Sequence, residues 1–530
     1  MLDQYSSLDV VVFVSYALLL LITGYWFNRK AKSGADFFLA NNSMPVWAVA
    51  ISVLATSQSA ATFLGGPDQG YRGDLSYLAS NIGALIAAFF VSLILIPRFY
   101  QARVMTVYEL LHDRFGASAK QQAGCIYLFG RLLASGARLY MAAIAVAMIL
   151  FGDIAPSSVL SATVIICVGG LAYTVYGGVR TVIYSDVIQC FVYVSAAIAV
   201  IIWLLISIPA DYSTIIAALQ APIDGSASKL TLFDWRLDFS AGGVFTMASI
   251  LTGFVLLNIA AFGLDQDMTQ RVLTCKSAQD GAAAMISSIV LVIPVMLLFI
   301  TIGLLLYIFY QRPDLMMMAQ TDATTPRFAG ETVTIFMYYV LTQMPAGLKA
   351  WVTIGIIAAA LSTLNSGLNS MASVIVNDLL KPFYAKQSKV LSSNQEVRSG
   401  QWAMGGVAIL LATVAGICFY WQQYTDTPLL QFALSVMVFS YSGLLGVYFT
   451  AIFTQRGSKL SVLLALISGF IVPLALQPYI LNQWLSSEET VTLGFTWQLL
   501  LGTLTSSIVC LCGAKQPPTA SQNRAQPRAS

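Results

Sequence analysis

The chain carries little charge for its length. Asp, Glu, Lys and Arg make up 10% of its 530 residues, and there is one histidine, His112. This excludes the composition of a typical soluble globular protein, in which about 25% of residues are charged. The seven cysteines form no paired metal-ligand pattern, and the sequence contains no phosphate-binding loop. We therefore predict that the protein is not an enzyme.

Long hydrophobic runs fill the sequence instead. Hydrophobic residues make up 58% of the chain, and its mean hydropathy is +0.76. Because a bilayer core about 30 Å thick requires roughly 20 apolar residues for each helical crossing, we predict an all-α polytopic membrane protein with about 13 transmembrane helices. The apolar stretches are residues 8–27, 46–66, 75–97, 122–150, 157–176, 182–208, 241–264, 282–310, 346–376, 402–421, 429–454, 460–481 and 496–512.

The positions of Lys and Arg predict the orientation in the membrane. With the N-terminus outside, nineteen of the 27 basic residues, Arg271 among them, fall in cytoplasmic loops, and six fall outside. Because basic loops are retained in the cytoplasm, we predict an integral plasma membrane protein of the bacterial inner-membrane type, with the C-terminus inside. Residues 515–530 are rich in Pro, Gln, Ser and Ala, which predicts a disordered cytoplasmic tail. The net charge of +3 reflects cytoplasmic loops, and no nucleic-acid partner is expected.

The segment "ALSTLNSGLNSMAS", residues 360–373, is unusually polar for a membrane span. On a helix its polar side chains form one stripe within an arc of about 140°. Such a stripe is typical of close helix packing, and it is also typical of a sodium site built from hydroxyl groups and freed carbonyls. The residues of the stripe are Ser362, Asn365, Ser366, Asn369, Ser370 and Ser373.

The second polar segment is "VLATSQSAATFLGG", residues 53–66. Gln58 and Ser59 lie at its centre, and two glycines follow. This pattern indicates either a discontinuous helix whose backbone carbonyls line a cavity, or a kinked packing interface.

Three ionisable residues lie inside predicted spans, where uncompensated charge is unfavourable. Asp186 would belong to an ion path, or would reach the cytoplasmic interface or pair with Arg180. Arg131 and Arg138 lie seven residues apart and share a helix face. Arg138, near mid-depth, is suited to bind a substrate carboxylate through bidentate hydrogen bonds. The alternative for both arginines is structural pairing with Asp153 or a carbonyl.

With these residues in view, the chain resembles the solute:sodium symporter family, which includes bacterial sodium/galactose, sodium/sialic acid and sodium/proline transporters. The resemblance covers about residues 8–460. It is carried by "DFFLANNSMPVWAVAISVLATSQSAATF" (36–63), "TVYELLHDRFG" (106–116), "YTVYGGVRTVIYSDVIQ" (173–189), "QRVLTCKS" (270–277) and "AAALSTLNSGLNSMASVIVND" (358–378).

The resemblance implies a leucine-transporter-like core of two inverted five-helix repeats. It places one transmembrane domain at 1–514, with an accessory helix at 8–27, repeats at 46–208 and 241–454, and further accessory helices at 460–512. It also implies sodium as the coupling ion. The implied first sodium site consists of the carbonyls of Ala55, Gln58 and Ala359 and the hydroxyls of Ser362 and Thr363. The implied second site consists of Asp186, Asn365 and Ser366, with Asn365 in place of a hydroxyl.

The solute positions implied by the family are Ser59, Thr62, Asn81 and Asn258, to which the residue reading adds Arg138. The lysine and tyrosine with which the galactose carrier holds its sugar match Val290 and Ala261, so a galactose specificity is not supported. The buried arginine of the sialic acid carriers lies about three residues from Arg138 in register.

The function predicted from the sequence is sodium-coupled import of a small polar solute by alternating access. We favour a carboxylate such as a sialic acid or another organic anion. The alternatives are a neutral hexose and, less favoured, a solute sensor with the same fold. The expected partners are the solute, sodium and the lipid bilayer, and the protein is expected to function as a monomer.

Overall fold

The computed structural model describes residues 6–27, 31–223, 225, 227–316, 327–328, 331–332, 334–422, 429–485 and 491–515. Over these residues the protein is helical, as predicted, apart from one short antiparallel pair of strands, β1 (Arg327–Phe328) and β2 (Glu331–Thr332). Beyond Lys515, the tail predicted to be disordered lies outside the described residues.

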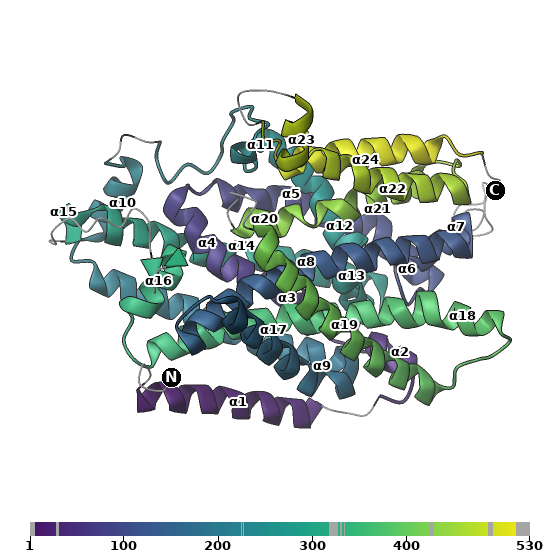
Figure 1. The fold of residues 1–530 in the computed structure, drawn as a ribbon, viewed down its shortest axis with the longest axis horizontal. Helices are drawn as coiled ribbons and strands as arrows, with labels where there is room; N and C mark the ends of the chain where they lie inside the picture. Colours follow the sequence, from purple (N-terminus) through teal and green to yellow (C-terminus); the bar gives the residue numbers. More distant parts are fainter. Residues whose placement is uncertain are drawn as a thin grey trace.

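The helices run mainly along one long axis (Figure 1). The first half of the chain contains α1 (Ser7–Phe27), α2 (Gly34–Leu39), α3 (Val46–Ser57), α4 (Ala60–Arg72), α5 (Ser76–Phe90), α6 (Ile96–Ala102), α7 (Glu109–Phe115), α8 (Ala117–Phe151), α9 (Pro156–Ser207), α10 (Tyr212–Gln220), α11 (Met247–Ser249), α12 (Val255–Gly263) and α13 (Gln266–Val272). The second half contains α14 (Ala278–Gln311), α15 (Pro313–Met316), α16 (Ile335–Thr342), α17 (Leu348–Val374), α18 (Lys381–Lys386), α19 (Ser393–Gln422), α20 (Leu429–Ser435), α21 (Val438–Phe453), α22 (Lys459–Ala475), α23 (Pro478–Leu485) and α24 (Phe495–Leu511). Short π-helical segments at Val91–Leu95, Ile250–Phe254 and Ile375–Leu380 extend α5, α11 and α17.

Seven of the described helical segments are long and apolar enough to cross a membrane, and two bent helix pairs would raise the number to nine. Four shorter apolar helices, of 10–17 residues, lie within α1, α9, α22 and α24. Each predicted apolar stretch contains a described helix. The number of thirteen crossings remains a prediction.

Helix α17, which carries the polar stripe, lies deep inside the protein. In its most apolar window 89% of the residues are buried, compared with 33% in α19 and in the second part of α9. Helix α1 lies along one edge of the molecule, and α22 and α24 lie along the opposite edge (Figure 1). The polar stripe is therefore enclosed by protein.

The second predicted span is broken, which confirms the discontinuous helix. Helix α3 ends at Ser57, Gln58 and Ser59 have non-helical backbone angles, and α4 begins at Ala60. The Ser59 side chain caps α4 by accepting a hydrogen bond from the Ala61 backbone N–H. The break leaves carbonyls at the end of α3 and N–H groups at the start of α4 without helical partners.

A second break separates α12 from α13, whose axes differ by 57°. The intervening Asp265 caps α13 by accepting a hydrogen bond from the Asp267 backbone N–H at 2.9 Å. The predicted stretch 241–264 therefore ends at a break, and a further helical segment continues beyond it.

Helix α9 joins the predicted stretches 157–176 and 182–208 through a kink at Gly178. The φ of Gly178 is 60°, and a Cβ atom there would lie 2.3 Å from the Phe37 carbonyl oxygen of α2. Only glycine accommodates both the left-handed backbone and this close approach.

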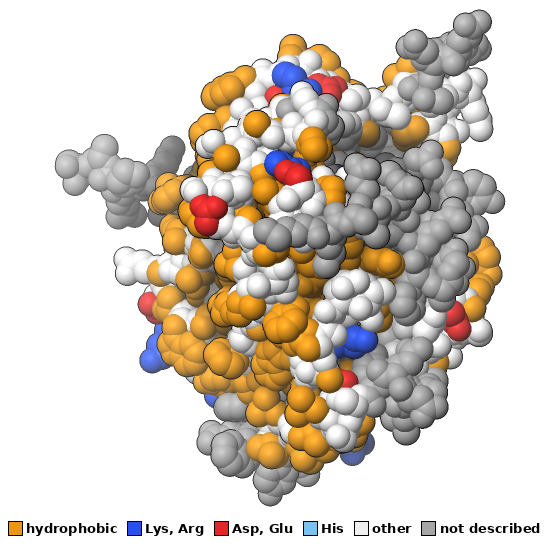
Figure 2. Space-filling model, turned by 90° about the vertical axis from the view of Figure 1, so that its left-hand side faces the viewer, with side chains coloured by type: hydrophobic (Ala, Val, Ile, Leu, Met, Phe, Trp, Pro, Cys, Tyr) orange, Lys and Arg blue, Asp and Glu red, His pale blue; other side chains and the backbone are white. Residues whose placement is uncertain are grey.

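The end of the molecule that carries α10, α15 and α16 is shown in Figure 2. Its charged side chains are few and scattered among hydrophobic and uncharged ones.

Candidate functional site

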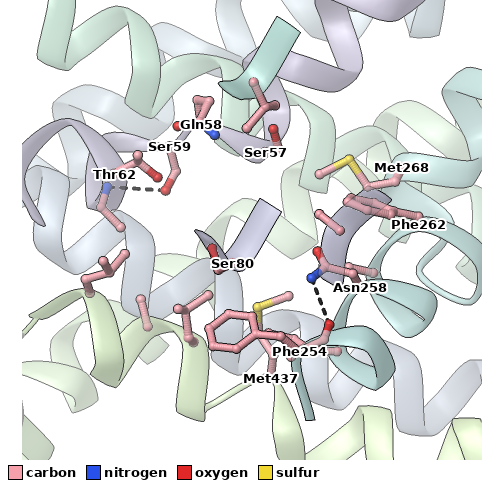
Figure 3. A pocket seen from close by; sticks show the side chains of 18 of the residues that line it. Ser57, Gln58, Ser59, Thr62, Ser80, Phe254, Asn258, Phe262, Met268 and Met437 are labelled. Atoms are coloured by element: carbon pink, nitrogen blue, oxygen red, sulfur yellow. Dashed lines mark hydrogen bonds between the residues drawn. The ribbon is translucent and has the colours of Figure 1, made fainter. Parts of the chain in front are cut away.

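A cavity of about 130 Å³ lies beside the break between α3 and α4. Side chains from α3, α4, α5, α8, α12, α13, α14, α20 and α21 line it, and part of this lining is shown in Figure 3. The cavity brings together all five predicted solute residues, Ser59, Thr62, Asn81, Arg138 and Asn258.

The two asparagines are held by hydrogen bonds from their amide nitrogens. Asn81 Nδ2 donates to the Leu78 carbonyl at 2.9 Å, and Asn258 Nδ2 donates to the Phe254 carbonyl at 2.8 Å (Figure 3). Each amide thus donates one hydrogen bond within its own helix, and Asn81 Nδ2 also contacts the Met296 sulfur on α14 at 3.1 Å. The Oδ1 atoms remain to accept hydrogen bonds from hydroxyl or amide groups of a solute.

Apolar side chains form much of the remaining wall, as is typical of small-molecule sites. They include Phe254, Leu257, Val292, Met296, Leu430 and Met437. Ala261 also lines the cavity, whereas Val290 does not and is 52% exposed on α14. A lysine at position 290 would therefore not face this cavity.

Arg138 is half-buried, and its Nη2 atom lies 3.1 Å from the Met437 sulfur. Within the described part of the chain, no carboxylate lies within 4.0 Å of its guanidinium group, so the predicted pairing with Asp153 does not occur. Asp153 instead accepts a hydrogen bond from the Ala155 backbone. Arg138 therefore presents a cation without an acidic partner at the cavity.

Arg131, two turns away on α8, is paired with two acids through its Nη atoms. Its Nη1 atom lies 3.0 Å from Asp265 Oδ2, and its Nη2 atom forms an ion pair with Asp267. Tyr441 donates a hydrogen bond to the same oxygen of Asp265 at 2.6 Å. The expected alternative partners of Arg131, Asp153 or a carbonyl, are wrong because the break before α13 brings two acids to it.

Asp186 is fully buried, so its carboxylate does not reach the surface of the protein, and among the described residues it forms no ion pair with Arg180. Its Oδ1 atom accepts a hydrogen bond from Ser362 at 2.7 Å, and its Oδ2 atom lies 3.2 Å from Arg271 Nη2. Arg180 instead donates to the Ala40 carbonyl and to Ser43. The assignment of Arg271 to a cytoplasmic loop is also wrong, because its side chain is buried in α13.

The residues of the implied first sodium site are buried near the break. Ser362 donates to Asp186, and Thr363 Oγ1 donates to the Ala359 carbonyl at 3.2 Å. A second, small cavity of about 10 Å³ is lined by Thr363 and by Ser59 and Arg138, which also line the larger one. The start of α4 therefore adjoins both the solute cavity and the hydroxyl groups of α17.

The residues of the implied second sodium site face different neighbours. Ser366 donates to Asp267 Oδ2 at 3.1 Å, and the Oδ1 atom of Asn365 faces Gly170, where an added Cβ would lie 2.6 Å from it. The α17 hydroxyl that contacts Asp186 is that of Ser362. A sodium ion shared by Asp186, Asn365 and Ser366 would require these contacts to change.

Sequence reasoning missed four members of this region: Asp265, Asp267, Arg271 and Tyr441. A signal was present in "DQDMTQR", residues 265–271, where two acids and an arginine follow directly after an apolar stretch. Such a segment is also typical of a solvated loop. If a second broken span had been expected from the first one, this segment would have been interpreted as a buried half-helix.

Comparison with known proteins gives consistent matches. The sequence model described as "Sodium:solute symporter family" matches residues 37–469. A sodium/sialic acid symporter from Aliivibrio fischeri is 26% identical, over 96% of this chain and 93% of that protein. A sodium/glucose cotransporter from Vibrio parahaemolyticus is 24% identical, over 95% and 91%. A solved structure of a sodium-coupled sialic acid symporter in a substrate-bound, outward-open state has the same fold, with a TM-score of 0.78 at 22% identity, covering 97% of this chain and 100% of that one.

Proposed function

The chain belongs to the sodium:solute symporter family, and from this premise we propose that it imports a small organic anion together with sodium by alternating access. The favoured solute is a carboxylate, such as a sialic acid or a simpler organic acid. The observation that carries this choice is Arg138, a cation that lines the cavity without a carboxylate within ion-pair distance among the described residues.

A buried guanidinium group is unfavourable unless an anion or several acceptors compensate it. A solute carboxylate would provide two parallel hydrogen bonds, which match the planar fork of arginine. Asn81 and Asn258, with Ser59 and Thr62, would then read hydroxyl or amide groups on the rest of the molecule. The apolar wall would accept the carbon skeleton of the solute.

For sodium, we propose the first site at Ala55, Gln58, Ala359, Ser362 and Thr363. Hydroxyl groups and the carbonyls freed by the helix break are oxygen ligands suited to this hard cation. Asp186, Asn365 and Ser366 are proposed as a second site. Each sodium ion that moves down a potential of 100 mV contributes about 2.3 kcal/mol, so the number of functional sites sets how steeply the solute can be concentrated.

The proposed architecture has thirteen crossings in one domain, 1–514, with the N-terminus outside and repeats at 46–208 and 241–454. In support, a broken helix lies near the start of each proposed repeat, as expected if the two segments are structural repeats of each other. The two halves would rock around the cavity, and we propose that a monomer suffices.

A neutral hexose is the second candidate. Its support is the pair of asparagine Oδ1 atoms at the cavity, which accept from hydroxyl groups. The relative from Vibrio parahaemolyticus is described as a glucose cotransporter.

A thermal-shift screen of the purified protein tests these proposals. The panel contains sialic acid, short carboxylates, sugars and amino acids, each in sodium and in potassium chloride. We expect a carboxylate to raise Tm more in sodium than in potassium. Stabilisation by hexoses alone would favour the second candidate, and the absence of any sodium-dependent effect would contradict sodium-coupled binding.

A further inference from the structure

A continuous chain of buried ionic contacts connects the solute cavity to the hydroxyl groups of α17. Its five members, Arg131, Asp265, Asp267, Arg271 and Asp186, are each at most 3% exposed. Within hydrophobic surroundings such a cluster is costly to build unless every charge is paired. Because the cluster lies between the two proposed binding regions, we expect it to have a function beyond stabilising the fold.

The contacts follow one another in order. At the cavity, Arg131 binds Asp265 and Asp267. Asp267 Oδ1 lies 2.8 Å from Arg271 Nη1, and Arg271 Nη2 reaches Asp186 at 3.2 Å. Asp186 then accepts the Ser362 hydroxyl at 2.7 Å.

Arg271 occupies the middle of this chain. Its Nε atom donates to Ser52 Oγ on α3 at 2.8 Å, while Nη1 and Nη2 contact acids from α13 and α9. One planar guanidinium group thus ties together the first half of one broken span and the second half of the other. Lysine could keep the charge but not these three directed contacts.

The net charge of this buried region depends on which ligands, sodium or solute, are bound. The five-membered chain contains two arginines and three aspartates, and Arg138 at the cavity brings the total to three of each. A sodium ion alone would leave one net positive charge in the low-dielectric interior, and a solute anion alone would leave one net negative charge. Binding of one sodium ion, at the first site, together with one solute anion restores neutrality, so these two ligands favour each other.

We propose that Arg271 is a positioning residue that couples sodium binding to solute binding, an inference that rests on the proposed function. Sodium beside Ser362 attracts the Asp186 carboxylate and weakens its contact with Arg271. Arg271 then binds Asp267 more strongly, and Asp267 withdraws from Arg131. This rearrangement of ion pairs extends to the break between α12 and α13, where Asn258 and Asp265 line the cavity.

The test compares the affinity for sialic acid in potassium and in saturating sodium, measured by calorimetry on the purified full-length protein. The ratio of the two dissociation constants is the coupling factor, which we expect to be about tenfold or more in the wild type. In Arg271→Lys we expect this factor to fall to about twofold or less. This change corresponds to a loss of about 1 kcal/mol of coupling free energy. The matched control is Arg180→Lys, which changes a half-buried arginine outside the chain of contacts and should keep the wild-type factor.

Ser52→Ala is the second variant, in case Arg271→Lys does not fold. It removes the acceptor of Arg271 Nε together with the hydroxyl donor to Asp186, and should reduce the coupling factor by about twofold, which is half of the coupling free energy lost in Arg271→Lys. The inference is overturned if both affinities weaken in a variant while their ratio stays at the wild-type value, because that is the signature of a structural role. A wild-type protein without any sodium effect on sialic acid binding would overturn the proposed function itself.

Discussion

Arg131 and Arg138 lie on the same face of α8, two turns apart, yet their surroundings are opposite. Arg131 is buried, is paired with Asp265 and Asp267, and lines the cavity. Arg138 contacts the sulfur of Met437, and no acid of the described residues lies within ion-pair distance. A buried arginine with two acids is neutralised by the fold, whereas one without an acid is available to a ligand. The comparison thus separates a residue that holds the structure from one that we propose recognises the solute.

Removing the two guanidinium groups should have very different effects on stability. Arg131→Met leaves Asp265 and Asp267 without their cation, and we expect the free energy of unfolding to fall by about 3–5 kcal/mol. Arg138→Met removes an unpaired cation and should change it by less than about 1 kcal/mol. Thermal unfolding of both variants in detergent, without solute, measures the difference. Equal losses of stability would show that the two arginines are not distinct.

The next prediction concerns solute recognition by Arg138. Arg138→Lys keeps the charge but loses the bidentate geometry, so sialic acid should bind about 10 to 100 times more weakly, as expected when hydrogen bonds to a charged group are lost. The sodium-dependent rise in Tm without solute should stay unchanged, because the proposed sodium ligands lie on α3, the break that follows it, α9 and α17, and none lies on α8. Calorimetry and thermal shift measure the two effects. A variant that binds sialic acid like the wild type would remove Arg138 from the solute site.

A smaller effect is expected at the sodium ligands. Ser362→Ala combined with Thr363→Ala removes two oxygen ligands at a cost of about 1.4 kcal/mol, which raises the half-maximal sodium concentration about tenfold. Sodium titrations of solute uptake measure it. Ser370→Ala is the control, because this hydroxyl belongs to the same stripe but accepts a hydrogen bond from Tyr127. Unchanged sodium dependence in the double variant would contradict the first sodium site.

The sequence predicted those parts of the site that depend on local pattern. The run of polar residues around Gln58 predicted the break in the second span, and the five predicted solute residues line one cavity. The buried ion pairs were not predictable, because Arg131 and Asp265 lie 134 positions apart, and only the folded structure brings this α8 side chain to the break before α13. Counting Arg271 as a loop residue failed for a related reason. A basic residue beyond an apolar stretch is usually solvated, but here the residues of α13, after the second break, are buried in the protein.

The most direct measurement of the central claim is uptake of radiolabelled sialic acid into proteoliposomes, driven by an inward sodium gradient and compared with an inward potassium gradient. The account predicts transient accumulation above the external concentration with sodium alone, and its loss in Arg138→Lys at the same solute concentration. Uptake that proceeds equally in potassium would contradict sodium coupling. Sodium-dependent uptake of glucose in place of sialic acid, unaffected by Arg138→Lys, would contradict the assignment of the solute as an organic anion.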